Sequence, residues 1–182
     1  MLIRVVPVGN PPDNILTILC SQLENLLKCK CRLLRKIDIP KHAHNHWRKQ
    51  YNSEIIMAEV ANIPEVKFID KDIPTLMVTE EDIYFKTLNF VFGLEDPISS
   101  CCIVSIARLR PEFYDEKPDQ RLTTERLIKE AMHEIGHLKG MDHCINKECI
   151  MAYSPSVKDI DNKKKMFCER CKLNMITRGV KI

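Results

Sequence analysis

The sequence predicts a fold of the α/β class (α+β in some schemes), and three neighbouring stretches carry that prediction. Residues 2–8 alternate and are rich in β-branched side chains, which is typical of a strand. Residues 13–27 place apolar side chains at a helical period, and residues 29–37 again have the pattern of a strand. A strand, a helix and a second strand in this order predict a parallel strand pair joined by a crossover.

The remaining elements follow in order along the chain. Asp13 or Asn14 is expected to cap the first helix, and Pro40 closes the second strand. A second helix is predicted over residues 48–62, before Pro64. Further strands are predicted over residues 65–69, 74–78, 83–85, 88–93 and 102–107, and a polar loop over residues 110–121.

Length and composition predict one domain that spans residues 1–182. With 45% hydrophobic and 29% charged residues, the chain has the composition of an ordinary soluble protein. The N-terminus lacks the features of a signal peptide, and no apolar run reaches the length of a membrane span. We therefore expect a cytoplasmic protein with no membrane partner. The net charge of +3 is too small to imply a polyanionic partner.

A third helix is predicted from Asp119 or Thr123 to Leu138, and it has two chemically different faces. At about 100° per residue, its apolar side chains share one broad arc. These residues are Leu127, Ile128, Ala131, Met132, Ile135 and Leu138. His133 and His137 lie roughly opposite the centre of that arc. Histidines that only fill a core would lie on the apolar arc, so these two are expected to face a cleft.

The spacing of His133, Glu134 and His137 is that of a catalytic zinc site. Histidines four residues apart project from one face of a helix and can bind the same ion, and the glutamate can act as base toward a zinc-bound water. Gly140 would let the chain leave the helix, so that His143 returns as the third ligand. The sequence therefore predicts a zinc hydrolase, although imidazole ligands also accept iron or cobalt.

Four of the nine cysteines predict a second metal site. They are spaced as two pairs, Cys144 with Cys149 and Cys168 with Cys171. Two such pairs suit a closed, structural zinc ion held by four thiolates. Because Cys144 follows His143 directly, this zinc would brace the loop that carries the third catalytic ligand. The other five cysteines are interpreted as ordinary core or surface residues: Cys20, Cys29, Cys31, Cys101 and Cys102.

Two further features are assigned no role in either site. His42, His44 and His46 form a histidine-rich tract, which we interpret as a solvated loop rather than a metal site. Residues 144–182 carry nine lysines or arginines against four aspartates or glutamates. A zinc held by four thiolates has a net charge of −2, which these cations would offset. The alternative is a nucleic-acid-binding zinc knuckle, but few aromatic residues are available there for stacking.

The combined motif resembles that of the archaemetzincin family of metalloproteases. It is carried by His133, Glu134, His137, Gly140, His143, Cys144, Cys149, Met151, Cys168 and Cys171. Residues 89–93 and 105–109 also resemble that family. Met151 corresponds to the methionine of the turn beneath the three zinc histidines, where its role is structural. Tyr153 lies where some related proteases carry a tyrosine near the metal, but we interpret it as a surface or core residue.

The resemblance implies a metzincin-like fold with a twisted, mostly parallel mixed sheet, a backing helix and an active-site helix. Residues 1–139 would form the upper part, and residues 140–182 a short zinc-stabilised C-terminal part with the methionine turn. It also implies two zinc ions, one catalytic and one structural, and an edge strand at Leu88–Gly93 that pairs with a peptide or protein substrate. The implied activity is that of a zinc-dependent peptidase with Glu134 as general base, and more narrowly of an aminopeptidase.

The main competing hypothesis is a catalytically silent, zinc-stabilised module that binds protein or nucleic acid. Such a module would be expected to lack Glu134 or the third histidine, and both are present. The sequence leaves open the natural substrate, cleavage inside a chain or at its end, regulation and the oligomeric state.

Overall fold

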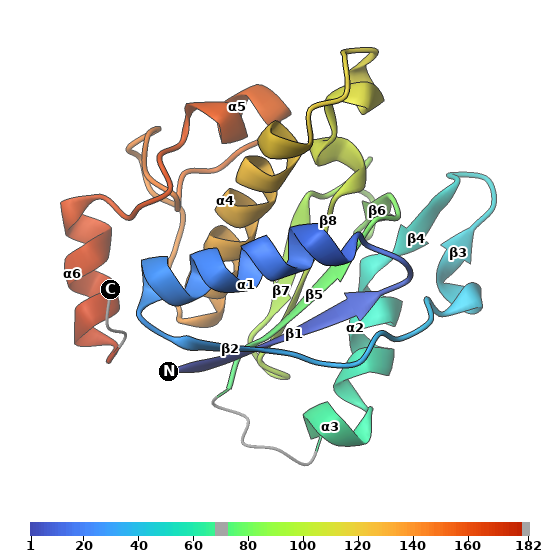
Figure 1. Ribbon diagram of the computed structural model, residues 1–182, viewed down its shortest axis with the longest axis horizontal. Helices are drawn as coiled ribbons and strands as arrows, with labels where there is room; N and C mark the ends of the chain where they lie inside the picture. Colours follow the sequence, from blue (N-terminus) through green and yellow to red (C-terminus); the bar gives the residue numbers. More distant parts are fainter. Residues whose placement is uncertain (68–72, 180–182) are drawn as a thin grey trace.

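The computed structural model describes residues 1–67 and 73–179 of the chain. Its main sheet has five strands in the order β2-β1-β5-β8-β7 (Figure 1). The strands are β1 (Leu2–Val8), β2 (Lys30–Leu33), β5 (Thr75–Thr79), β7 (Gly93–Asp96) and β8 (Cys101–Ser105). The first four neighbours in this order pair in parallel, and β7 pairs antiparallel with β8 at the edge. The predicted α/β fold and its mostly parallel sheet are confirmed.

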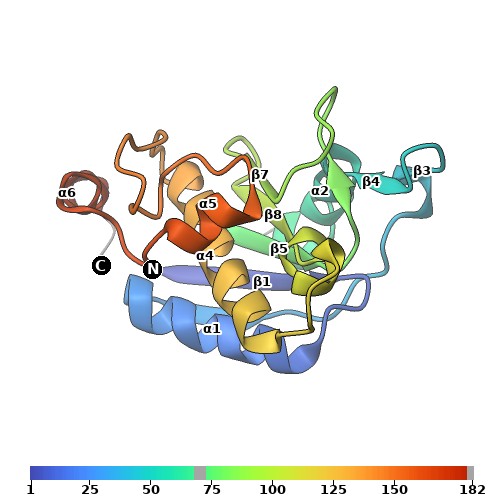
Figure 2. The same ribbon diagram turned by 90° about the horizontal axis from the view of Figure 1, so that it is seen from above.

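Helices cover both faces of this sheet. Figure 2 shows α1 (Asp13–Leu27) on one side and α2 (Ser53–Ala61) on the other. Successive side chains of a strand point to opposite faces, so β1 contributes to two cores. Ile3 and Val5 pack with α1 and with α4 (Gln120–Leu138), whereas Val6 and Val8 pack with α2. The active-site helix α4 therefore packs on the same face of the sheet as the backing helix α1.

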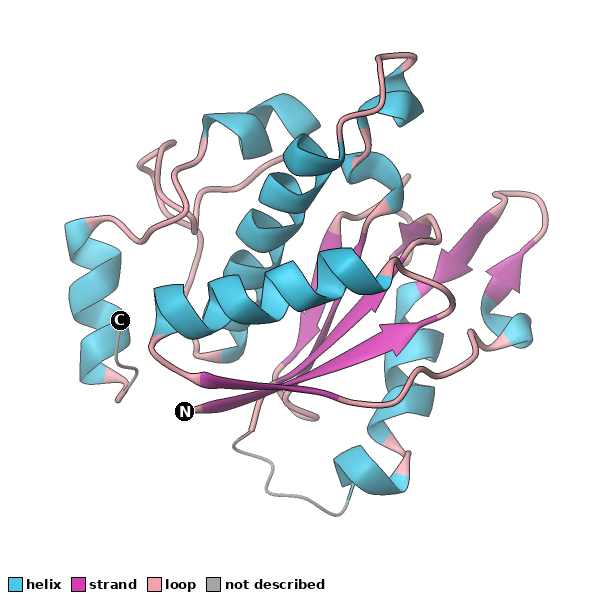
Figure 3. Ribbon diagram, viewed as in Figure 1, coloured by secondary structure: helices cyan, strands magenta, loops and turns pink. Residues whose placement is uncertain are grey.

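A smaller sheet and several short helices complete the chain (Figure 3). In the small sheet, β3 (His44–Asn45) pairs antiparallel with β4 (Gln50–Asn52), which pairs in parallel with β6 (Ile83–Tyr84). The short helices are α3 (Pro64–Lys67), α5 (Val157–Asn162), α6 (Glu169–Thr177) and the 3₁₀ helices η1 (Lys41–Ala43), η2 (Ala107–Leu109) and η3 (Pro111–Tyr114). Within the described residues, no helix has both the length and the apolar character to cross a membrane.

The predicted helix at residues 48–62 is shorter than expected. Its first part is the strand β4, because the Asn45 side chain accepts hydrogen bonds from the backbone N–H groups of Trp47 and Arg48 and closes a hairpin turn. The helix α2 begins only at Ser53. Its N-cap is Asn52, whose side chain accepts hydrogen bonds from the backbone N–H groups of Glu54 and Ile55.

Two other strand predictions were also wrong in part. Residues 64–67 form the short helix α3, since Pro64 suits a first helical turn; residues 68 and 69 of that predicted strand lie outside the described residues. The strand predicted at residues 29–37 ends at Leu33, and only Ile37 rejoins the sheet, as an isolated bridge to Val8.

The edge strand lies later in the chain than the predicted Leu88–Gly93. The observed strand β7 begins at Gly93, and residues 88–92, which precede it, line the cleft. The side chains of Arg48 and Gln50 donate hydrogen bonds to the carbonyl groups of Leu88 and Asn89, which holds this segment against the small sheet. Alternating apolar residues were therefore a misleading signal here, because side chains from another sheet fix the backbone.

Candidate active site and a four-cysteine cluster

The active-site helix α4 is fixed by its cap and by its apolar face. The Asp119 side chain accepts a hydrogen bond from the backbone N–H of Leu122 at 2.9 Å and so caps the helix. The predicted apolar arc, except the half-buried Leu138, is buried against the sheet and α1. The opposite face carries His133 and Glu134 into a cleft of about 340 Å³. Both side chains are nevertheless only 5% exposed, so the cleft is narrow around them.

The three predicted zinc histidines come together. One ring nitrogen from each of His133, His137 and His143 lies within 4.8 Å of the others. The chain returns to the site because Gly140 ends the helix at φ +74°, a left-handed conformation that glycine adopts without strain. The backbone N–H of Gly140 donates to the His137 carbonyl, and that of Met141 to the Gly136 carbonyl.

Two of these rings are held in one tautomer. The Nδ1 atom of His133 donates to the Ile150 carbonyl oxygen at 2.9 Å, and that of His137 donates to the Met141 carbonyl at 2.7 Å. A carbonyl oxygen only accepts, so each Nδ1 carries the ring proton. Burial lowers the pKa of His133 well below its ordinary value, and nearby positive charge from Lys163 and His137 adds to this. In a neutral ring held in this way the Nε2 atom carries a lone pair, and both Nε2 atoms face the site.

This arrangement fits a metal ion. The Nε2 atoms of His133 and His137 are 3.0 Å apart, and two neutral rings that carry their protons on Nδ1 have no proton to share at this distance. Two lone pairs that face each other so closely repel unless a cation lies between them. In a tetrahedral zinc site with bonds of about 2.05 Å, two ligand nitrogens are about 3.3 Å apart. The donor set and its spacing fit a zinc ion.

Glu134 is buried beside the edge strand. A Cβ atom on Gly93 would lie 2.6 Å from its Oε1 and 2.8 Å from its Cδ, so any side chain there would displace the Glu134 carboxylate. Its Oε2 atom is buried without a hydrogen-bond partner in the described part of the chain. Burial raises the pKa of Glu134 well above its ordinary value, and the negative charges of Glu130 and Glu95 raise it further. An unpartnered carboxylate oxygen in the cleft is available to a water or a substrate.

Met151 packs against Gly136 of the active-site helix α4. A Cβ atom on Gly136 would lie 2.4 Å from the Met151 sulfur. This glycine makes room for the methionine, which is fully buried. The Met151 carbonyl accepts a hydrogen bond from the backbone N–H of Cys144 at 2.8 Å. This hydrogen bond joins the turn at Met151 to the segment that follows His143.

Three residues near the site were not predicted from the sequence. Glu130 and Lys163 form an ion pair at 3.1 Å, with side-chain exposures of 5% and 0%. Glu130 precedes Glu134 by one helical turn, so its place on the cleft face could have been read from the spacing. Lys163 follows α5, and Glu95 lies on the edge strand; neither has a local signal that links it to the motif.

Tyr153 lies on the wall of the cleft. Its ring packs edge-on against the ring of His143 at a centroid distance of 5.1 Å, and the residue is 58% exposed. The structure thus makes it a surface residue that contacts a predicted metal ligand.

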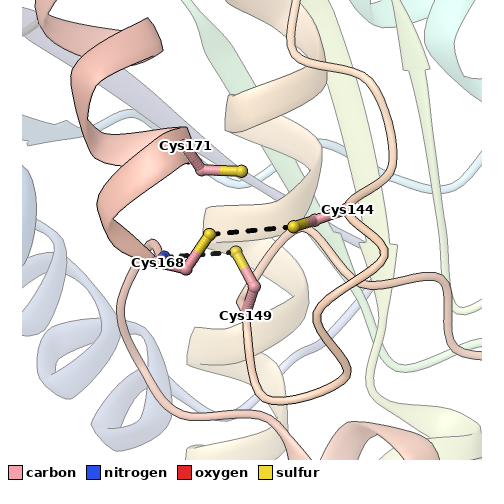
Figure 4. A group of neighbouring side chains, drawn as sticks. All are labelled: Cys144, Cys149, Cys168 and Cys171. Atoms are coloured by element: carbon pink, nitrogen blue, oxygen red, sulfur yellow. Dashed lines mark hydrogen bonds between the residues drawn. The ribbon is translucent and has the colours of Figure 1, made fainter.

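The four predicted cysteines also come together (Figure 4). The Sγ atoms of Cys144 and Cys168 are 3.7 Å apart, close to the value of about 3.8 Å that zinc–sulfur bonds of about 2.3 Å imply for a tetrahedral site. Burial opposes ionisation of Cys168, but hydrogen bonds from the backbone of Cys171 and from the neighbouring thiols outweigh it and lower its pKa to about 7. A thiol poised to ionise is suited to bind a metal.

The histidine tract forms no such group. His42 contacts Glu59 at 3.4 Å, and the rings of His44 and His46 are 4.6 Å apart. Among the described residues, only the three histidines and the four cysteines gather enough ligand atoms for a metal ion. Three cations of the C-terminal region form ion pairs: Lys163 with Glu130, Lys164 with Glu148, and Lys165 with Glu125.

Comparisons with known proteins agree with this geometry. The model of peptidase family M54 matches residues 19–177. The archaemetzincin of Methanocaldococcus jannaschii is 40% identical over 182 residues, covering 100% of this chain and 97% of that protein. The archaemetzincin of Pyrococcus furiosus is 36% identical, covering 93% of this chain and 90% of that protein.

Solved structures give the same answer. The crystal structure of archaemetzincin from Archaeoglobus fulgidus, complexed with malonate, aligns with a TM-score of 0.78 at 33% identity, covering 94% of this chain and 98% of that one. The structure of a zinc-dependent peptidase from Methanocorpusculum labreanum aligns with a TM-score of 0.86 at 28% identity, covering 95% and 99%. The chain belongs to peptidase family M54, the archaemetzincins, and is a zinc-dependent metallopeptidase.

Proposed function

We propose that His133, His137 and His143 hold the catalytic zinc ion and that Glu134 is the general base of peptide hydrolysis. The observation that carries the proposal is the convergence of the two Nε2 atoms at 3.0 Å, with both Nδ1 atoms donating to backbone carbonyls. When bound, zinc lowers the pKa of a coordinated water toward neutrality and polarises the scissile carbonyl.

Glu134 supplies the proton transfers. Its buried Oε2 atom has no partner among the described residues, and its raised pKa makes it a stronger base than an exposed carboxylate. It would accept a proton from the attacking water and pass that proton to the leaving amine nitrogen. Gly93 leaves room for the Glu134 side chain, because a larger residue at position 93 would collide with the Glu134 carboxylate.

A second, structural zinc at Cys144, Cys149, Cys168 and Cys171 completes the proposal, giving two zinc ions per chain. It would join α6 to the segment that carries His143, since Cys168 is the N-cap residue of α6 and Cys144 follows His143 directly. Nine unpaired cysteines also support a reducing, cytoplasmic location. The catalytic zinc would then join the upper part (residues 1–139) to the C-terminal part (residues 140–182), and the structural zinc would lie within the C-terminal part.

The variant Glu134→Gln tests the assigned base. It should bind as much zinc as the wild type, because no ligand is removed, yet it should lose peptide hydrolysis. Zinc content by atomic emission and turnover of a peptide library would be measured on the same preparations. Hydrolysis at the wild-type rate by the variant would overturn the role of Glu134, and a wild-type protein with two zinc ions and no cleavage would favour a binding module.

A further inference from the structure

The cleft has two chemically different ends. Its acidic end is formed by Glu95, Glu130 and Glu134, and its apolar end by Phe85, Leu88, Phe90 and Phe92. In the part of the chain that the structure describes, no lysine or arginine lines this cleft. A substrate therefore meets negative charge at one end and aromatic rings at the other.

Only one of the three carboxylates is neutralised within the protein. The fully buried side chain of Lys163 forms an ion pair with Glu130. For Glu95 and Glu134, the described residues provide no ion pair, and Glu134 keeps one buried oxygen without a partner. Apart from the proposed zinc ion, no cation among the described residues therefore pairs with Glu95, whose carboxylate is available to a cationic group of the substrate.

Glu95 lies on the edge strand and faces the active site. It follows Gly93 by two residues on β7, and residues two apart in a strand point to the same face. Since Gly93 faces the Glu134 side chain directly, Glu95 points to the same side and is half-buried in the cleft wall. Its neighbour Asp96 points the other way and accepts a hydrogen bond from the Ser99 hydroxyl at 2.6 Å.

We propose that Glu95 is a specificity-determining residue that binds an ammonium group of the substrate on the N-terminal side of the scissile bond. This inference rests on the proposed peptidase function and names the substrate class for the same site. The ammonium group has two possible sources, the free α-amino terminus of the peptide or a lysine side chain. The first source would make the enzyme an aminopeptidase, and the second a lysine-directed endopeptidase.

The direction of the strand supports the assignment to the N-terminal side. β7 is the last strand of the sheet, so its outer edge can pair with a bound peptide. A peptide antiparallel to β7 would have its N-terminal side near Glu95 and its C-terminal side toward Phe92 and Phe90. The same peptide then places apolar residues after the scissile bond against the aromatic end of the cleft.

Matched peptides distinguish the two sources of charge. The first pair differs only in a free or an acetylated N-terminus, and the second pair in lysine or methionine before the scissile bond. For the wild type we expect kcat/KM to be roughly ten- to a hundredfold higher for the charged member of one pair, as for a partly buried charge-assisted hydrogen bond. Glu95→Gln should abolish that preference, and Glu95→Lys should reverse it in favour of the uncharged member. Asp96→Asn, the matched control on the same strand, should keep the wild-type preference.

Binding gives a readout that does not depend on turnover. In the Glu134→Gln background, calorimetry should show tighter binding of the charged peptide, and Glu95→Gln should remove that difference. An unchanged preference in Glu95→Gln would overturn the inference, as would an equal loss in Asp96→Asn. Loss of zinc in Glu95→Gln with the preference intact would mean that Glu95 only balances the charge of the metal, which also overturns it. Failure of the wild type to cleave any peptide would instead count against the proposed function, and the binding experiment would still decide the role of Glu95.

Discussion

Replacing Gly93 by alanine would press one methyl group against Glu134 without removing a metal ligand or the base itself. The added Cβ would lie 2.6 Å from Oε1, 2.7 Å from Cγ and 2.8 Å from Cδ of Glu134. Ordinary contacts begin at 3.4 Å, so the carboxylate must move by about 0.8 Å. Glu134 is 5% exposed and has little free space into which to move.

A displacement of this size should slow catalysis strongly. A misplacement of about 1 Å in a reacting group costs on the order of a hundredfold, so we expect kcat of Gly93→Ala to fall by about 10- to 100-fold. This corresponds to about 1.4 to 2.7 kcal/mol of transition-state stabilisation. The zinc content should stay at the wild-type value, because the three atoms nearest to the new methyl group all belong to Glu134 and none to a histidine.

The assay is steady-state hydrolysis of one good peptide substrate, with zinc content and thermal unfolding measured on the same protein. A wild-type kcat for Gly93→Ala would refute the idea that this glycine positions the base. Loss of zinc together with loss of activity would also refute it, since the effect would then lie in the metal site.

Three further predictions concern the residues around the site. Gly136→Ala should lower the free energy of unfolding by up to about 2 kcal/mol, because overpacking against Met151 costs about 1 to 3 kcal/mol while alanine stabilises the helix by about 1 kcal/mol. Urea unfolding measures this change, and a variant more stable than the wild type would contradict the close contact. Lys163→Met should lower the free energy of unfolding by about 3 to 5 kcal/mol, because it leaves Glu130 charged and buried. Adding Glu130→Gln should recover much of this loss, and equal stability of the single and double variants would argue against the ion pair. In metal-free protein, the rate of alkylation of Cys168 should rise as the pH increases through about 7, where its thiolate forms, and added zinc should suppress the reaction. Peptide mapping that finds another of the four cysteines labelled first would contradict the assigned pKa.

The site was largely predictable because its signals are local. His133, Glu134 and His137 share a helix whose period and cap are written in adjacent residues, and Gly140 marks the place where that helix ends. The four cysteines were found from spacing alone, although they come from α6 and from a loop far from it in the sequence.

The parts that the sequence did not predict depend on contacts between distant segments. The edge strand starts at Gly93 rather than Leu88, because Arg48 and Gln50 hold the preceding carbonyl groups. The position of Glu95 beside Glu134 follows from that register, since a shift of one residue would turn it to the other face. Short-range periodicity contains no information about such contacts.

X-ray absorption at the zinc edge tests the central claim most directly, namely that three imidazoles hold one zinc and four thiolates hold another. On the active wild-type protein with two zinc ions, the average first shell should contain about two sulfur atoms and about two nitrogen or oxygen atoms per zinc. Cys149→Ser should lower the sulfur count, and His133→Ala should lower the nitrogen count. A wild-type first shell of sulfur alone, or of nitrogen and oxygen alone, would contradict the two-site account.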